Sequence, residues 1–154
     1  MKIAIIGTGN LGLSIAKGLV INNTYTTLYL TKRNLDTLSN WKEYKNVTLT
    51  KDNSKALSNA DIVIFAVQPS QFGAILNEIK PILNDKHVLI STITGYTIGR
   101  METHIGNQYP IIRAMPNTAI SVGKSMTCLC NNTVGKKSLP IAEAIFNGLG
   151  TTLT

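Results

Sequence analysis

Apolar and polar positions follow two different periods along this chain. Short apolar runs predict buried strands, and segments whose apolar positions recur at helical spacing predict helices. We predict strands near residues 2–6, 26–31, 47–49, 61–66, 87–92, 109–114, 125–130 and 151–154. We predict helices near residues 10–22, 34–43, 53–58, 70–80, 97–105 and 137–148. Strands that alternate with helices over short connections are typical of an α/β fold. The prediction is a Rossmann-type, doubly wound, mainly parallel sheet in three α/β/α layers.

The first predicted strand runs directly into a glycine-rich turn. Gly7-Thr8-Gly9-Asn10-Leu11-Gly12 has the spacing G-x-G-x-x-G, and a helical pattern starts inside it. In this context the motif predicts a dinucleotide site. Gly7 permits the tight turn, Gly9 leaves the backbone open to a pyrophosphate, and Gly12 allows close helix packing. Free N–H groups at the helix start favour a bound phosphate. A glycine turn without a ligand is the alternative.

The end of the second predicted strand indicates which dinucleotide is bound. An acidic residue about 20 positions after the glycines would indicate NAD. This chain has Thr31-Lys32-Arg33 there, with two cations and a hydroxyl. Arg33 can make a bidentate, charge-assisted contact with a 2′-phosphate. We therefore predict NADP(H), with NAD(H) as the alternative.

Two further strand ends should lie at the same edge of the sheet. The fourth predicted strand leads to Ala66-Val67-Gln68-Pro69, and the fifth leads to Ile93-Thr94-Gly95. Ligands of open parallel sheets bind outside the carboxyl ends of the strands. These residues are expected to border the diphosphate and the nicotinamide ribose, and a purely structural turn is the alternative at each.

Composition narrows the class of protein. The chain has 154 residues, 44% of them apolar and 15% charged, which suits one globular domain at residues 1–154. It has neither an apolar run long enough to cross a membrane nor a signal-peptide pattern, so we expect a cytoplasmic protein. The net charge is +7, but the basic residues lack interleaved aromatics and are scattered among acidic ones. We therefore expect no nucleic-acid partner. One local excess, beside the expected adenosine end of a dinucleotide, comprises Lys32, Arg33, Lys42, Lys45, Lys51 and Lys55, with a solvated basic face as the alternative.

Other reactive side chains form no recognisable constellation. Cys128 and Cys130 alternate in a predicted strand, and we expect both to be reduced and buried. They are not spaced as C-x-x-C, and His87 and His104 are isolated. We predict no metal site.

A second motif carries a family resemblance. Arg113-Ala114-Met115-Pro116-Asn117-Thr118-Ala119, with the glycine motif, residues 66–69 and Gly123-Lys124-Ser125-Met126-Thr127, resembles the N-terminal domain of pyrroline-5-carboxylate reductases. The resemblance runs through essentially the whole chain. It implies NADPH-dependent reduction of 1-pyrroline-5-carboxylate to L-proline, the last step of proline biosynthesis.

The resemblance also implies which residues line the cofactor. These positions are Gly7, Thr8, Gly9, Asn10, Leu11, Gly12, Thr31, Arg33, Asn53, Ala66, Val67, Gln68, Pro69 and Gly95. We add Lys32 to them because of its positive charge. Met115, Pro116 and Asn117 should lie near the nicotinamide. The chain departs from the family at Gln68, where Lys is usual, at Ile93-Thr94, where Ala-Ala is frequent, and at Ala119, where Pro is frequent.

The resemblance further implies an all-helical domain that is absent from this chain. In the family that domain forms the homo-oligomer and supplies the substrate loop, so we expect the isolated chain to be inactive. We assign no catalytic residue here. Arg113 is expected to form a structural ion pair rather than to hold the substrate carboxylate. Two alternatives stay open: a non-catalytic NADP-sensing module, and another NADP-linked reductase of the 6-phosphogluconate dehydrogenase-like superfamily.

Overall fold

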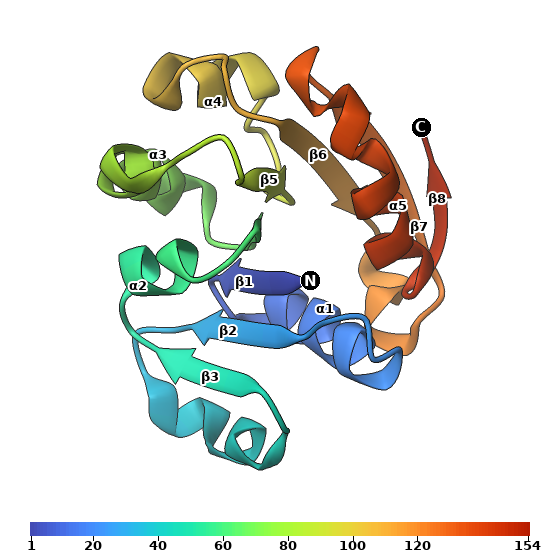
Figure 1. Cartoon of the computed structure of the whole chain (residues 1–154). Helices are drawn as coiled ribbons and strands as arrows, with labels where there is room; N and C mark the ends of the chain where they lie inside the picture. Colours follow the sequence, from blue (N-terminus) through green and yellow to red (C-terminus); the bar gives the residue numbers. More distant parts are fainter.

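The computed structural model describes residues 1–154 and is built on one eight-stranded sheet (Figure 1). The strands are β1 (Lys2–Ile6), β2 (Thr27–Thr31), β3 (Val47–Thr50), β4 (Ile62–Phe65), β5 (Val88–Ser91), β6 (Ile111–Pro116), β7 (Ser125–Asn131) and β8 (Gly150–Leu153). Their order is β3-β2-β1-β4-β5-β6-β7-β8. All neighbouring pairs are parallel except β6 and β7, which are antiparallel. The strand order reverses between β1 and β4, which is where open α/β sheets bind ligands.

Helices cover both faces of the sheet. The α-helices are α1 (Asn10–Ile21), α2 (Asn53–Ser58), α3 (Pro69–Ile79), α4 (Ile98–Ile105) and α5 (Leu139–Asn147). Four 3₁₀ helices are η1 (Leu35–Glu43), η2 (Lys80–Ile82), η3 (Thr118–Val122) and η4 (Val134–Ser138). Side chains of α1, η1 and α5 join the apolar cluster on one face, and those of α2, α3 and α4 join the cluster on the other. The predicted three-layer Rossmann-type architecture is confirmed.

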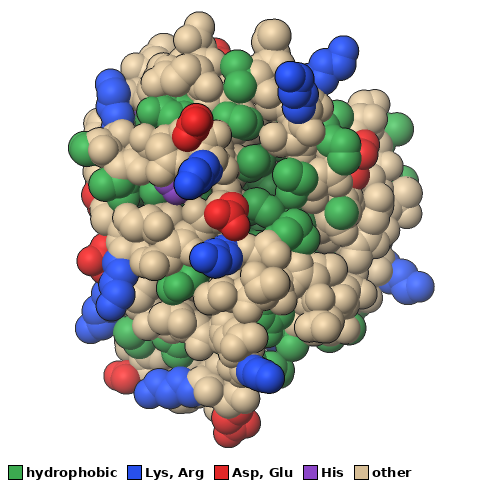
Figure 2. All heavy atoms as spheres, in the orientation of Figure 1, with side chains coloured by type: hydrophobic (Ala, Val, Ile, Leu, Met, Phe, Trp, Pro, Cys, Tyr) green, Lys and Arg blue, Asp and Glu red, His purple; other side chains and the backbone are tan.

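The central strands are apolar throughout because both of their faces are buried. In β1, Ile3 and Ile5 belong to one cluster, and Ala4 and Ile6 belong to the other. On the surface in view in Figure 2, Lys and Arg side chains are spread out, while apolar side chains gather near the middle. No helix of the chain has the length and apolar character needed to span a membrane.

The predicted elements are confirmed, with shifts at their ends. Residues 34–43 form a 3₁₀ helix rather than an α-helix, and the last predicted helix divides into η4 and α5. The largest shift is in β6, which was predicted at 109–114 and lies at Ile111–Pro116. Met115 and Pro116 therefore belong to a strand, because β6 pairs with β7 as far as Pro116 and Thr127.

The prediction that Cys128 and Cys130 are buried is wrong. Both thiols are free, and both residues are exposed. In β7 the intervening residues Ser125, Thr127 and Leu129 are buried instead. Only one face of β7 is covered, so its alternation places both cysteines on the open face.

Candidate functional site

The glycine turn between β1 and α1 is closely packed at its first and last glycine. Gly7 has φ +91°, and a Cβ on it would meet the Val67 side chain and come within 2.9 Å of the Ala66 carbonyl oxygen. A Cβ on Gly12 would collide with the carbonyl oxygen of Gly7. Both glycines are therefore needed for the turn and for the approach of α1 to β1.

The middle glycine of the motif faces open space. A Cβ on Gly9 would meet no atom within 4 Å. Gly9 is also the N-cap residue of α1, and no side chain caps the helix. The first N–H groups of α1 are consequently free to donate to an external acceptor. Open space beside uncapped N–H groups fits a phosphate group.

Thr31, at the end of β2, holds this turn in place. Its hydroxyl accepts a hydrogen bond from Gly7 N at 3.1 Å, and its carbonyl accepts from Thr8 N and Thr8 Oγ1, both at 3.0 Å. Thr31 is only 2% exposed. Because the Thr31 hydroxyl only accepts here, its proton stays free, and its contact with a 2′-phosphate remains a prediction.

Most of the predicted cofactor residues line one cavity of about 770 Å³, which we call the basic pocket. Its walls come from the glycine turn, from the ends of β2, β3 and β4, from the start of α2, and from α3. They comprise Gly7, Thr8, Gly9, Thr31, Lys32, Arg33, Asn34, Lys51, Asn53, Ala66, Val67, Gln68, Ser70, Gln71, Ala74 and Ile75. The charged residues among them are Lys32, Arg33 and Lys51, so the cavity holds three cations and no carboxylate. Such a wall favours an anionic ligand.

Sequence reasoning missed several residues of the basic pocket. Asn34 and Lys51 follow the ends of β2 and β3, and Ser70, Gln71, Ala74 and Ile75 belong to α3. A local excess of basic residues around Lys51 was a usable signal. The α3 residues carried no such signal, since their place depends on how α3 packs beside β4.

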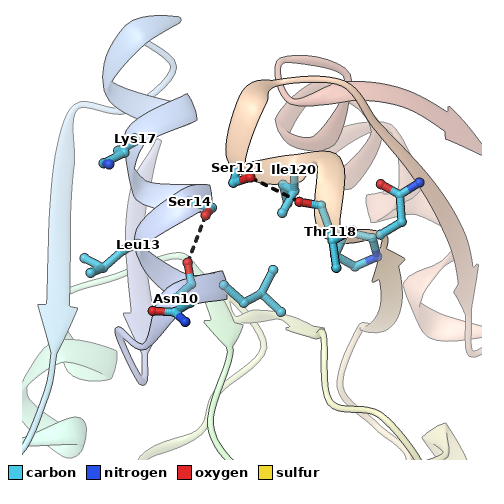
Figure 3. A pocket seen from close by; sticks show the side chains of 10 residues that line it. Asn10, Leu13, Ser14, Lys17, Thr118, Ile120 and Ser121 are labelled. Carbon is cyan, nitrogen blue, oxygen red and sulfur yellow. Dashed lines mark hydrogen bonds between the residues drawn. The ribbon is translucent and has the colours of Figure 1, made fainter.

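Of the remaining predicted cofactor residues, some line a second cavity and the others line neither cavity. The second cavity, of about 610 Å³, lies between α1 and η3, and we call it the α1–η3 pocket (Figure 3). It is lined by Asn10, Leu11, Leu13, Ser14, Lys17, Pro116, Asn117, Thr118, Ile120 and Ser121. Asn10, Leu11, Pro116 and Asn117 were predicted. Gly12, Pro69, Gly95 and Met115 line neither cavity.

Internal hydrogen bonds shape the α1–η3 pocket. Asn117 caps η3, because its side-chain Oδ1 accepts a hydrogen bond from Ala119 N at 3.1 Å. The backbone N–H of Asn117 donates to Ser125 Oγ at 3.3 Å. On the facing walls, Ser14 Oγ donates to Asn10 O at 2.9 Å and Ser121 Oγ donates to Thr118 O at 3.1 Å (Figure 3). These hydroxyl protons are already used, so the hydroxyl oxygens face the pocket as acceptors.

Arg113 does not form the structural ion pair that we predicted. Its Nε is buried and has no hydrogen-bond partner. Arg113 lies in β6, on the face opposite to that of Ala114. It lines neither the basic pocket nor the α1–η3 pocket.

Comparison with known proteins places this site in a family. Residues 2–95, more than half of the chain, match the family described as NADP oxidoreductase coenzyme F420-dependent. The chain belongs to this family. A curated relative, pyrroline-5-carboxylate reductase 2 of Dictyostelium discoideum, is 36% identical over 99% of this chain and 57% of its own length. The chain thus spans little more than half of this relative.

Solved structures give the same result. A pyrroline-5-carboxylate reductase from Coxiella burnetii has a TM-score of 0.92 and 36% identity, over 99% of this chain and 57% of that one. The Plasmodium falciparum pyrroline carboxylate reductase, solved with NADP bound, has a TM-score of 0.85 and 28% identity, over 99% and 56% of the two chains. The resemblance to pyrroline-5-carboxylate reductases that the motifs indicated is confirmed.

Proposed function

We propose that this chain is the cofactor-binding part of an NADPH-dependent pyrroline-5-carboxylate reductase, which reduces 1-pyrroline-5-carboxylate to L-proline in proline biosynthesis. The observation that carries the proposal is the uncapped, glycine-lined start of α1, which lies between a strongly basic cavity and a largely uncharged one. That arrangement suits a ligand with a central diphosphate and two chemically different ends. The similarity to pyrroline-5-carboxylate reductases over nearly the whole chain supports the substrate.

The basic pocket is proposed to hold the adenosine 2′-phosphate. Lys32, Arg33 and Lys51 line it, and no carboxylate is present to repel a phosphate. The guanidinium of Arg33 can donate two parallel hydrogen bonds to one phosphate, which a lysine ammonium cannot match in geometry. The Plasmodium falciparum relative with NADP bound supports the same cofactor. NADPH should therefore bind more tightly than NADH.

The α1–η3 pocket is proposed to receive the nicotinamide end. Leu11 and Pro116 give it apolar walls, while Asn10 and Asn117 offer polar groups that can orient a carboxamide. When bound, the nicotinamide supplies the hydride. The residues of this chain orient it and exclude water from one side. The chain offers no proton donor that we assign to the imine nitrogen.

The domain organisation, the assembly and the location of the protein also belong to the proposal. Residues 1–154 form one domain, and an additional helical domain of the whole protein closes the substrate site. That domain also forms the homo-oligomer. The protein acts in the cytoplasm, and besides its own copies it binds small molecules but neither nucleic acid nor a membrane. The proposal of a second domain agrees with the span of the chain, which is little more than half the length of the Dictyostelium discoideum, Coxiella burnetii and Plasmodium falciparum relatives.

A chimera tests the reductase proposal directly. Residues 1–154 would replace the matching region of Dictyostelium discoideum pyrroline-5-carboxylate reductase 2, and turnover of 1-pyrroline-5-carboxylate with NADPH would be measured. We expect activity from the chimera and none from the 154-residue chain, although both bind NADPH. A folded chimera that binds NADPH without turnover contradicts the proposed activity. Turnover by the isolated chain contradicts the proposal that an additional helical domain closes the substrate site.

A further inference from the structure

One face of β7 carries a row of sulfur-containing side chains. Met126, Cys128 and Cys130 alternate with buried residues and point to the open face of the strand. Met126 is 49% exposed, and both cysteines are free and exposed. The apolar cluster on this side of the sheet contains no residue of β7 or β8. The sulfur atoms are therefore accessible on the surface of the chain.

The neighbouring strand adds a fourth sulfur and a cation to the same face. In the antiparallel register of β6 and β7, Met115 is the partner of Cys128 and Arg113 is the partner of Cys130. Cross-strand partners share a face, and their Cβ atoms lie about 4.5–5.5 Å apart. The register thus places Cys128, Cys130, Met115 and Arg113 next to one another on one face of the β6–β7 pair.

We propose that Cys128, Cys130 and Met115 bind one soft monovalent cation, with copper(I) as the ion that the ligand set fits. Thiolate and thioether sulfurs select copper(I) over hard cations. No three His, Cys, Asp or Glu side chains of the chain lie together so that they could hold a metal ion. A tetrahedral zinc site of the usual composition is therefore not available, and the thioether serves as the third ligand.

The strand geometry suits a bridging ion better than a disulfide. Residues two apart in a strand are separated by about 6.6 Å, and their Cβ atoms point the same way. A disulfide needs Cβ atoms about 3.5–4.5 Å apart, which this strand does not offer. Two sulfurs on opposite sides of one metal ion lie roughly 4.6 Å apart if each bond is about 2.3 Å. Rotation of both side chains toward each other covers that difference.

A residue on the same face of the sheet, Arg113, balances the charge of the proposed site. Two thiolates and one monovalent cation leave one negative charge. Arg113 lies beside Cys130, and its buried Nε–H has no partner in the protein. A charge-assisted hydrogen bond to the Cys130 thiolate would satisfy that donor. Binding releases one proton from each thiol to solvent and changes no oxidation state.

Anaerobic titration with copper(I) against the chelator bicinchoninate tests the site on the intact 154-residue chain. We expect one tightly held copper(I) per chain. Cys128→Ser and Cys130→Ser should each weaken binding by at least about 100-fold, and Met115→Leu by roughly 10-fold. Met126→Leu is the matched control and should stay within about 2-fold of the wild type, because Met126 has no sulfur partner across the strand pair.

Circular dichroism of each variant checks that the fold is kept. Alkylation of the thiols with iodoacetamide tests the copper(I) site in the wild-type chain, without any substitution. Alkylation should abolish copper(I) binding. Retention of copper(I) by the doubly substituted cysteine variant, or by the alkylated chain, would overturn the proposal. Failure of the wild type to compete with the chelator, or equal affinity for zinc(II), would overturn it as well.

Discussion

The two cavities beside α1 differ in charge and in construction. The basic pocket has Lys32, Arg33 and Lys51 in its walls, whereas Lys17 is the one charged residue of the α1–η3 pocket. The basic pocket therefore selects by charge, and the α1–η3 pocket selects by shape and by hydrogen-bond acceptors. Under the proposed function, the first distinguishes NADP from NAD and the second positions a ring.

The two cavities also depend on different kinds of contact. The cations of the basic pocket follow the ends of β2 and β3, which are adjacent in the sheet. The α1–η3 pocket needs α1 and η3, which are far apart in the sequence, to lie side by side (Figure 1). The shape of the α1–η3 pocket thus depends on how α1 packs against η3, whereas the charge of the basic pocket does not depend on that packing. Gly9 lines the basic pocket and directly precedes Asn10 and Leu11, which line the α1–η3 pocket, so a change at Gly9 acts where the two cavities meet.

Substitution of Gly9 should have the largest effect on binding. Gly9 lies at the start of α1 between the two cavities, and a side chain there meets no protein atom within 4 Å. Gly9→Val should therefore abolish measurable NADPH binding, because its branches fill the space proposed for the diphosphate. The thermal midpoint should remain near that of the wild type. Fluorescence titration and thermal denaturation measure the two effects.

Gly12→Val is the matched control at the other end of the motif. Its Cβ would collide with the carbonyl oxygen of Gly7, so the expected loss appears in stability. Overpacking of this kind destabilises by about 1–3 kcal/mol or more. Wild-type NADPH affinity in Gly9→Val would show that the motif is only a turn here.

Arg33→Ala should reduce NADPH affinity without changing that of NADH. A hydrogen bond to a charged group contributes about 1.5–3 kcal/mol, which corresponds to roughly 10- to 150-fold in affinity. Solvent around the exposed Arg33 should bring the effect toward the low end. Lys17→Ala, which removes the charge of the α1–η3 pocket, is the control and should leave the NADPH preference unchanged. Equal losses for both cofactors in Arg33→Ala would refute 2′-phosphate recognition by Arg33.

Lys51→Ala should produce the smallest effect of the three. Lys51 is an exposed point charge without the planar geometry of arginine, so we expect a loss of NADPH affinity of about 2- to 5-fold. The loss should shrink as salt is raised, because exposed charges are screened over about 10 Å at 0.1 M. Titrations at low and high ionic strength measure this. An effect that does not depend on salt would mean that Lys51 shapes the pocket rather than attracts the phosphate.

The sequence alone determined the order of the elements and the glycine site. Apolar runs such as Ile3–Ile6 predict buried strands, and the spacing of Gly7, Gly9 and Gly12 predicts the turn, because both signals are local. Lys32 and Arg33, which follow β2, could also be identified from the sequence. These features depend on residues that are neighbours in the chain, and the structure places them together as expected.

Tertiary structure alone decided the rest, because those features depend on pairings between distant residues. The antiparallel pairing with β7 made Met115 and Pro116 part of β6 and turned Met115 away from both cavities. The absence of a helix over one face of β7 exposed Cys128 and Cys130, although their alternation was visible in the sequence. Alternation shows which residues share a face, but only packing shows whether anything covers that face.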